Sequence, residues 1–199
     1  TMFEAIAPAP PDAILGLTEA FSADPSPEKI NLAVGVYKDE HGRTPTLDCV
    51  REAESRLAAA DRAKSYRPIN GAPTYGAAVR SLLFGADHPI LQAGRAVSAQ
   101  TPGGTGALRV AADYLHQLHP HATVHVSDPT WANHNGIFAA AGVQTRSYPY
   151  FDAATNDLAM DAMIAALEQI PAGDVALLHA CCHNPTGVDP DPEQWDRIA

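Results

Sequence analysis

Four short strand-like segments alternate with longer stretches of helical periodicity, and this alternation constrains the fold more than any other feature. The strand candidates lie near residues 97–100, 123–127, 143–148 and 175–182, and helical patterns between them cover roughly 105–118, 131–141 and 158–169. Strands separated by helices of this length favour βαβ units, whose strands run parallel in one sheet. The sequence therefore predicts an α/β fold with a mainly parallel sheet flanked by helices.

The first part of the chain is less regular and rich in proline. The residue pattern in this part predicts helices at 14–21, 50–60 and 77–83 and one brief strand at 31–34. The second helix is amphipathic, since Val50, Ala53, Leu57 and Ala60 recur at helical spacing.

Composition and charge exclude several classes of partner. The 199 residues carry a net charge of −10 and no cluster of Lys or Arg, so nucleic acid and anionic membranes are poor candidates. No apolar run approaches membrane-spanning length. The three cysteines are an odd number, and two of them are adjacent inside a predicted strand. This pattern favours a cytoplasmic protein over a disulfide framework.

The last predicted strand leads directly into polar, turn-forming residues. The run D-V-A-L-L-H-A-C-C at 174–182 is followed by H-N-P-T-G-V-D-P at 183–190, and a further helix candidate begins at Pro192. Open α/β sheets bind ligands beyond the carboxyl ends of their strands. The Asn184-Pro185 bond is also a candidate for a cis peptide. An ordinary βα loop remains the alternative.

A glycine-rich turn follows the first strand candidate and opens a helix. It reads T-P-G-G-T-G-A-L-R at 101–109. Glycines let a ligand approach the backbone, and the free N–H groups of a helix N-terminus favour an anion such as phosphate. A dinucleotide fingerprint needs another glycine where Arg109 stands, which argues against a nicotinamide oxidoreductase. A tight turn that needs small residues is an equally good interpretation.

The segment D-P-T-W-A-N-H at 128–134 lies between another strand and helix. Trp131 at a sheet edge could stack on a planar ligand, and His134 follows one helical turn later. A core tryptophan with a capping histidine is the alternative.

Together these segments, with V-G-V-Y-K-D at 34–39, closely resemble the aspartate aminotransferase family, the class I, fold-type I branch of pyridoxal-phosphate enzymes. The order and spacing of the motifs match from Phe3 to the last residue. The resemblance implies an N-terminal arm and small-domain segment over residues 1–45. Residues 46–199 would form the first half of the large domain, which binds pyridoxal 5'-phosphate.

The resemblance also implies roles for individual residues around the cofactor. Gly103, Gly104 and Thr105 would hold its phosphate. Trp131 would stack on the pyridine ring, with His134 beside it.

Other positions would contact the substrate, the ring oxygen or a second subunit. Asn184 would donate to the phenolic oxygen and, with Trp131 and Gly35, contact the substrate. Tyr66 would reach the phosphate of the neighbouring subunit, so the family forms homodimers with shared sites. His179 and His183 would support the ring from below, although buried structural histidines are the alternative. Both Asp128-Pro129 and Asn184-Pro185 are expected to be cis.

The family transfers an amino group between L-aspartate and 2-oxoglutarate by a ping-pong reaction through a lysine Schiff base. The lysines present are Lys29, Lys38 and Lys64, and none stands in the required context. We therefore expect the Schiff-base lysine to lie beyond Ala199 and this chain to contain no catalytic residue. The chain would then be a truncated piece that is inactive on its own. Val36, Lys38, Thr44 and Thr105 resemble the aspartate branch, and activity on aromatic amino acids stays open.

Two other functions compete with this one. A metal-binding module could use His179, Cys181, Cys182 and His183, but neighbouring strand residues point to opposite faces and would not converge on one ion. A non-catalytic fragment that only binds the cofactor or mediates dimerisation remains the alternative to an enzyme.

Overall fold

The computed structural model describes residues 13–31, 35–60 and 62–199. The chain divides into two units, Thr1–Ser65 and Tyr66–Ala199, which we describe separately. Of the strand predicted at 31–34, residues 32–34 lie outside the described ones. The domain boundary expected after residue 45 stays a prediction.

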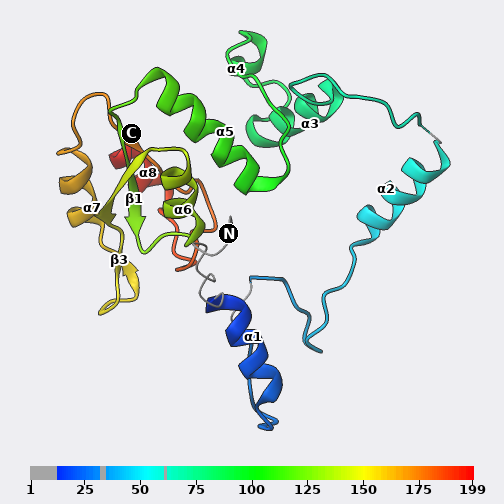
Figure 1. Cartoon of the computed structure of the whole chain (residues 1–199), viewed down its shortest axis with the longest axis horizontal. Helices are drawn as coiled ribbons and strands as arrows, with labels where there is room; N and C mark the ends of the chain where they lie inside the picture. The colour runs from blue at the N-terminus through cyan, green and yellow to red at the C-terminus, as the bar shows by residue number, and fades with distance from the viewer. Residues whose placement is uncertain (1–12, 32–34, 61) are drawn as a thin grey trace, which may run out of the picture. The chain divides into compact units, whose positions relative to one another are not determined.

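The described part of the first unit includes helices α1 and α2 (Figure 1). Helix α1 spans Ala13–Ala23 and α2 spans Asp48–Ala59, so both predicted helices are confirmed. The amphipathic pattern of α2 buries none of its residues, since Val50 remains 42% exposed and Leu57 61% exposed.

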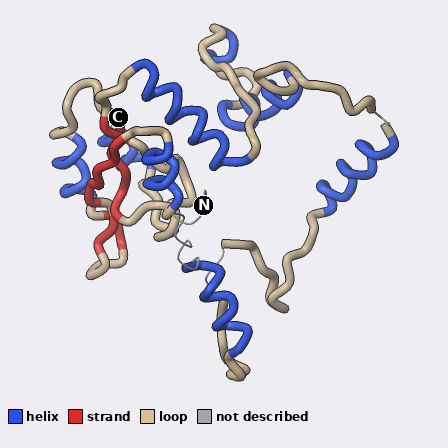
Figure 2. Tube along the Cα trace, in the orientation of Figure 1, coloured by secondary structure: helices blue, strands red, loops and turns tan. Residues whose placement is uncertain are grey.

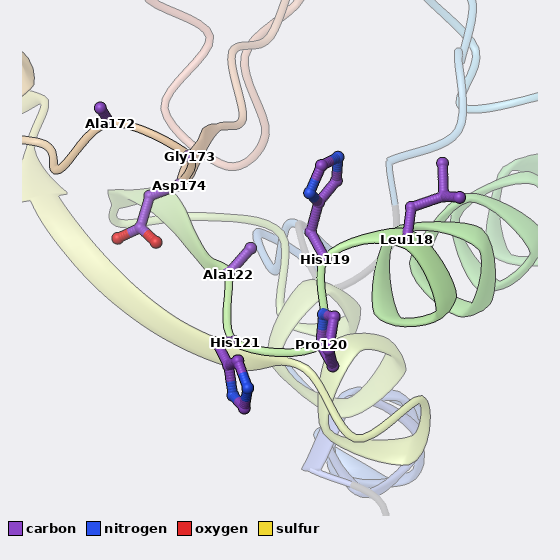
Figure 3. Close-up of a pocket in the computed structure, with 8 residues that line it drawn as sticks. All are labelled: Leu118, His119, Pro120, His121, Ala122, Ala172, Gly173 and Asp174. Atoms are coloured by element: carbon purple, nitrogen blue, oxygen red, sulfur yellow. The ribbon is translucent and has the colours of Figure 1, made fainter.

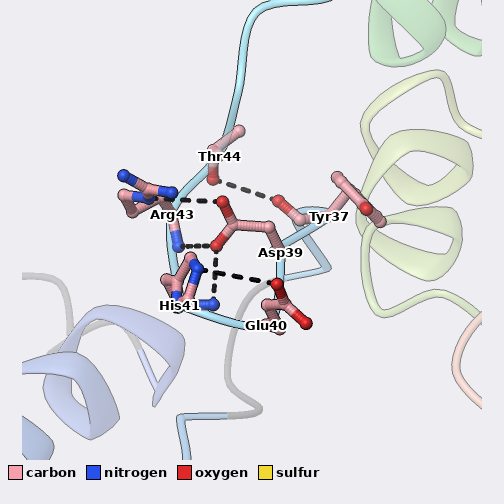
Figure 4. A network of polar contacts seen from close by, with 6 residues as sticks. All are labelled: Tyr37, Asp39, Glu40, His41, Arg43 and Thr44. Atoms are coloured by element: carbon pink, nitrogen blue, oxygen red, sulfur yellow. Dashed lines mark hydrogen bonds and ion pairs between the residues drawn. The ribbon is translucent and has the colours of Figure 1, made fainter.

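A tight turn lies between these two helices and follows the V-G-V-Y-K-D motif (Figure 4). The Asp39 carboxylate accepts hydrogen bonds from the backbone N–H groups of His41 at 2.9 Å and Arg43 at 2.8 Å. The Thr44 hydroxyl donates to the carbonyl of Tyr37 at 3.0 Å. These side-chain bonds replace ladder bonds and fix the turn locally.

The second unit is organised around a parallel sheet, shown in red in Figure 2. Its strands are β1 (Thr123–Asp128), β2 (Gln144–Pro149) and β5 (Val175–Ala176), in the order β2-β1-β5. Both pairings are parallel, with Val124 opposite Thr145 on one side and Val175 on the other. The predicted α/β class is confirmed.

Helices cover both faces of this sheet (Figure 1). Alternate β1 residues Val124 and Val126 pack with Ala112 of α5 (Gly103–Leu118) and Phe138 of α6 (Asn133–Ala140). On the opposite face Tyr148 packs with Met163 of α7 (Met160–Leu167) and against Ile198 of α8 (Pro192–Ile198). The period-2 alternation of the strands thus divides the core into two layers.

Four further elements complete this unit. They are α3 (Pro73–Phe84), α4 (Pro89–Gln92) and an antiparallel hairpin of β3 (Phe151–Asp152) and β4 (Asp157–Leu158). Helix α3 ends at Gly85, whose φ of +84° suits glycine. No helix in the described ranges is long and apolar enough to cross a membrane.

Two strand predictions need correction. Residues 97–100 form no strand. The backbone N–H of Gln100 donates to the Asn70 carbonyl at 3.0 Å, but no neighbouring strand lies alongside within the described chain, and Val97 is 93% exposed. The strand predicted over 175–182 ends at Ala176, although the Leu177 N–H still donates to the His125 carbonyl at 2.8 Å. Among the described residues no strand pairs with the outer side of β5, and its two residues are half-buried and exposed rather than buried.

Candidate functional site

The glycine-rich turn forms the N-terminus of α5. Gly103 adopts a φ of +70°, and the helix has no side-chain cap at Pro102. The N–H groups of the first helical turn have no acceptor within the helix. Because α5 is followed directly by β1 and packs against it, this turn lies at the edge where β1 ends.

The glycines of the turn differ in what they do for the fold. A Cβ on Gly106 would lie 3.0 Å from the Pro102 ring, so this glycine is needed for close packing. A Cβ on Gly104 would meet nothing within 4 Å, and Gly104 does not adopt a positive φ. The tight-turn interpretation therefore accounts for Gly103 and Gly106 but not for Gly104. The exposed backbone at Gly104 and Thr105 is open to a ligand.

Five rings form a continuous column beside the carboxyl ends of β1 and β5. Half-buried Trp131 meets His134 edge to face, with centroids 5.4 Å apart. His134 contacts His179 at 5.3 Å, and His179 contacts His183 at 4.3 Å. Tyr150 stacks on His183 at 3.8 Å. The structure thus brings together the two motifs that the sequence analysis treated separately.

Hydrogen bonds hold each imidazole of the column in place. His134 Nδ1 lies 2.7 Å from the Thr130 hydroxyl. His183 lies between the hydroxyls of Ser127, 2.9 Å from Nε2, and Thr186, 2.8 Å from Nδ1. His179 Nδ1 accepts the Asn184 N–H at 3.2 Å, which places the proton of neutral His179 on Nε2.

The histidines of the column are held uncharged. Burial lowers the pKa of His134, and the neighbouring His179 adds to this effect. Burial also lowers the pKa of His179, and it lowers the pKa of His183 to about 4. At neutral pH the column is therefore a neutral support with no buried charge.

The loop after β5 presents Asn184 to solvent. Both Asn184-Pro185 and Asp128-Pro129 are cis, as the resemblance implied. The Asp189 carboxylate accepts the N–H groups of Cys182 at 2.6 Å and His183 at 2.7 Å, and these two bonds lower the pKa of Asp189. The side-chain amide of Asn184 is exposed and makes no hydrogen bond to any described residue, so it is free to bind a ligand.

Two predicted site residues remain, Tyr66 and Gly35. Tyr66, at the start of the second unit, is fully exposed, and its predicted contact with a neighbouring subunit stays a prediction. Gly35 belongs to the first unit and has nothing within 4 Å of its Cβ position. Its predicted contact with substrate likewise stays a prediction.

Two open recesses lie near the candidate site and one lies away from it. A recess of about 440 Å³ adjoins the glycine turn, lined by Arg67, Gln100, Thr101 and Pro102 among others. A recess of about 510 Å³ includes Asp128, Pro129 and Thr130. A third of about 310 Å³ contains His119, His121 and Asp174 at the edge where β1 and β5 begin (Figure 3). Ligands of open α/β sheets bind at the opposite edge.

Sequence reasoning missed four residues of the site, namely Ser127, Thr130, Tyr150 and Asp189. The role of Asp189 had no local signal, because it accepts N–H groups six and seven residues earlier in the chain. The contact of Tyr150 with His183 had no signal in the sequence, because it joins segments more than thirty residues apart.

Among the described residues no group of three or more His, Cys, Asp or Glu side chains could hold a metal ion. Cys181 and Cys182 are exposed, while His183 is buried and bound to Ser127. The reason given from sequence, opposite faces of one strand, does not apply here because the strand ends at Ala176.

Comparisons with known proteins identify the family of the chain. The family model "Aminotransferase class I and II" matches residues 27–199. The aspartate aminotransferase of Escherichia coli K12 is 50% identical over 198 residues, and the aromatic-amino-acid aminotransferase of the same strain is 46% identical. They match 100% and 99% of this chain, and the chain spans about half the length of these curated relatives.

Solved structures give the same result. An aromatic amino acid aminotransferase from Burkholderia cenocepacia J2315 has a TM-score of 0.95 and 50% identity, with 100% of this chain and 50% of that chain covered. The Burkholderia pseudomallei aromatic-amino-acid aminotransferase, covalently bound to pyridoxal phosphate, has a TM-score of 0.94, 49% identity and the same coverage. The chain belongs to the class I and II aminotransferase family.

Proposed function

We propose that this chain supplies the phosphate- and ring-contacting residues of a pyridoxal-phosphate-dependent aminotransferase. The proposed reaction moves the amino group of L-aspartate to 2-oxoglutarate, giving oxaloacetate and glutamate. One observation carries the proposal: an open helix N-terminus at Gly104 and the column headed by Trp131 lie at the same edge of the sheet as the free amide of Asn184.

The residues present fit this cofactor. Its phosphate dianion suits the N–H groups of the first turn of α5, where Gly104 leaves the backbone uncovered and Thr105 adds a hydroxyl donor. When bound, the cofactor supplies a ring that withdraws electrons and stabilises negative charge at the substrate Cα.

Trp131 and Asn184 would orient this ring. The half-buried indole of Trp131 offers a face for stacking, and His134 fixes the indole from its edge. The free amide of Asn184 can donate to a ring oxygen and stabilise its negative charge. The neutral histidines behind Trp131 support it without placing a competing cation below the ring.

Further parts of the proposal concern the assembly. We propose a homodimer in which fully exposed Tyr66 reaches the phosphate of the neighbouring subunit, and in which Gly35 adjoins the substrate. Similarity to both aspartate and aromatic aminotransferases leaves aromatic amino acids as a second substrate class. The three free thiols suit a cytoplasmic protein.

The lysine that this reaction requires is not in the second unit, which contains none. In the first unit the Lys29 ammonium donates to the carbonyls of Phe21 at 2.7 Å and Asp24 at 2.6 Å, near the end of α1. We propose that the reactive lysine comes from sequence outside these 199 residues.

Binding of pyridoxamine 5'-phosphate tests the cofactor site, because this amine form cannot condense with lysines. Titration followed by calorimetry should show one site per chain, weakened at least tenfold by Trp131→Phe or Asn184→Ala. Trp195→Phe, in α8, is the matched control and should bind like the wild type. Equal affinity of the Trp131 and Trp195 variants for pyridoxamine 5'-phosphate would contradict the proposed cofactor site.

Two further measurements separate enzyme from binding module. Oxaloacetate formation from L-aspartate and 2-oxoglutarate, followed with malate dehydrogenase and NADH, tests the reaction, and tyrosine in place of aspartate tests the aromatic class. Borohydride reduction with pyridoxal 5'-phosphate and peptide mass spectrometry then locates the lysine. A stoichiometric pyridoxyl group on Lys29, Lys38 or Lys64 would contradict the proposed origin of that lysine. Cofactor binding without transamination in any longer form of the protein would favour the non-catalytic alternative.

A further inference from the structure

Two adjacent cysteines of the second unit are not used by the proposed function. Cys181 and Cys182 are free thiols, and both are exposed. They lie in the segment between β5 and the Asn184 turn. Two neighbouring thiols open to solvent are a chemical group in their own right, distinct from a single reactive cysteine.

The two cysteines do not continue the strand that precedes them. Adjacent residues of a strand point to opposite faces, but β5 ends at Ala176. Cys182 adopts a φ of +54°, which breaks the pleat between the two residues. The neighbouring Cys181 thiol raises the pKa of Cys182, and Asp189 adds a smaller contribution.

The main chain beneath the pair is held in place. Asp189 accepts the N–H groups of Cys182 and His183. His183 is in turn bound to Ser127 and Thr186 and stacked on Tyr150. A ligand that bridges the two sulfurs therefore meets a backbone that is already ordered, which lowers the entropic cost of binding.

We propose that Cys181 and Cys182 form a binding site for trivalent arsenicals, which bridge two thiols. The reaction balances without an oxidant: an organic arsenoxide R–As=O and two thiols give R–As(S–Cys)2 and one water. Two As–S bonds form, the As–O bond is lost, and the thiol protons leave with the oxygen. Within the described chain no third side chain joins the pair to hold a metal ion, so a ligand satisfied by two sulfurs fits best. This site does not depend on the proposed aminotransferase function.

Phenylarsine oxide is the probe, added to the reduced 199-residue chain. Intact-mass spectrometry should show one adduct per chain, equal to the reagent less one water. N-ethylmaleimide labelling and peptide mapping of the same wild-type sample should then modify Cys49 while Cys181 and Cys182 are protected. Because this mapping uses the wild-type chain, it does not depend on the folding of a variant.

Cysteine variants test the bridge. In Cys181→Ser and in Cys182→Ser, a competing monothiol should remove the arsenical at a concentration at least about 100-fold lower than in the wild type. A single As–S bond lacks the effective concentration that the second thiol provides. Cys49→Ser is the matched control, being an exposed lone cysteine of the other unit, and should bind like the wild type. A requirement for Cys49, an adduct that joins two chains, or full retention by either single variant would each overturn the proposal.

Discussion

The phenol ring of Tyr150 lies parallel to the imidazole of His183, with the centroids 3.8 Å apart and the planes inclined by 10°. Tyr150 directly follows β2, and its hydroxyl also donates to the Val188 carbonyl at 2.7 Å. Tyr150 thus contacts both the beginning and the end of the loop that presents Asn184. The position of that loop, which follows β5, therefore depends on a residue that follows β2.

Substitution of Tyr150 should separate these two contacts. Tyr150→Phe keeps the stack and loses the hydroxyl bond, which should cost about 1 kcal/mol of unfolding free energy. Tyr150→Leu loses both and should cost about 2–4 kcal/mol. Urea unfolding followed by tryptophan fluorescence measures the difference. Tyr114→Phe, at an exposed position on α5, is the control and should leave the unfolding free energy unchanged. Equal losses for the Phe and Leu variants would show that the stack contributes nothing.

Mild acid should destabilise the second unit through His183. Burial lowers the folded pKa of His183 to about 4, from an ordinary value of 6.5. The unfolded chain therefore binds more protons, and stability falls as the pH drops from about 6.5 to 4, with a loss of about 2 kcal/mol between pH 7 and pH 5. His134 and His179, whose pKa values are also lowered, act in the same direction. Urea unfolding at pH 7 and pH 5 measures this loss. It should shrink in His183→Gln, while an undiminished pH dependence would assign the effect to other groups.

Gly104→Ala separates the structural role of the glycine turn from the proposed ligand role. Because a Cβ there meets nothing within 4 Å, the variant should fold and gain up to about 1 kcal/mol of helix stability. The same methyl group should obstruct an approaching phosphate and weaken pyridoxamine 5'-phosphate binding at least tenfold. Gly136→Ala in α6 also has open space around its Cβ position and is the matched control. It should gain stability and keep full affinity. If Gly104→Ala bound pyridoxamine 5'-phosphate with unchanged affinity, the proposed phosphate position at this turn would be wrong.

The sequence predicted the elements whose signals are local. The helices at α3 and α5 and the strands β1 and β2 follow from periodicity and from stop residues such as Gly85. The predictions at 97–100 and over most of 175–182 were wrong because a strand needs a partner, and apolar composition does not show whether one is present. Trp131, His134 and Asn184 could be chosen from their motifs. The Tyr150–His183 stack could not, because the fold alone brings those segments together.

Asp189→Asn tests what holds the backbone around Cys182 and His183. The carboxylate accepts two N–H groups, and an amide oxygen can replace only one of its two oxygens. Since Asp189 is exposed, we expect a modest loss of about 1 kcal/mol at pH 7. The folded pKa of Asp189 is lowered, so its contribution is present above about 3.8 and is lost as the pH falls through the folded value. The difference between wild type and variant in urea unfolding should therefore narrow in strong acid. Asp161→Asn removes an exposed pair with Arg197 and should have no measurable effect. A loss as large in the Asp161 variant, or a difference that persists at the lowest pH, would contradict this role for Asp189.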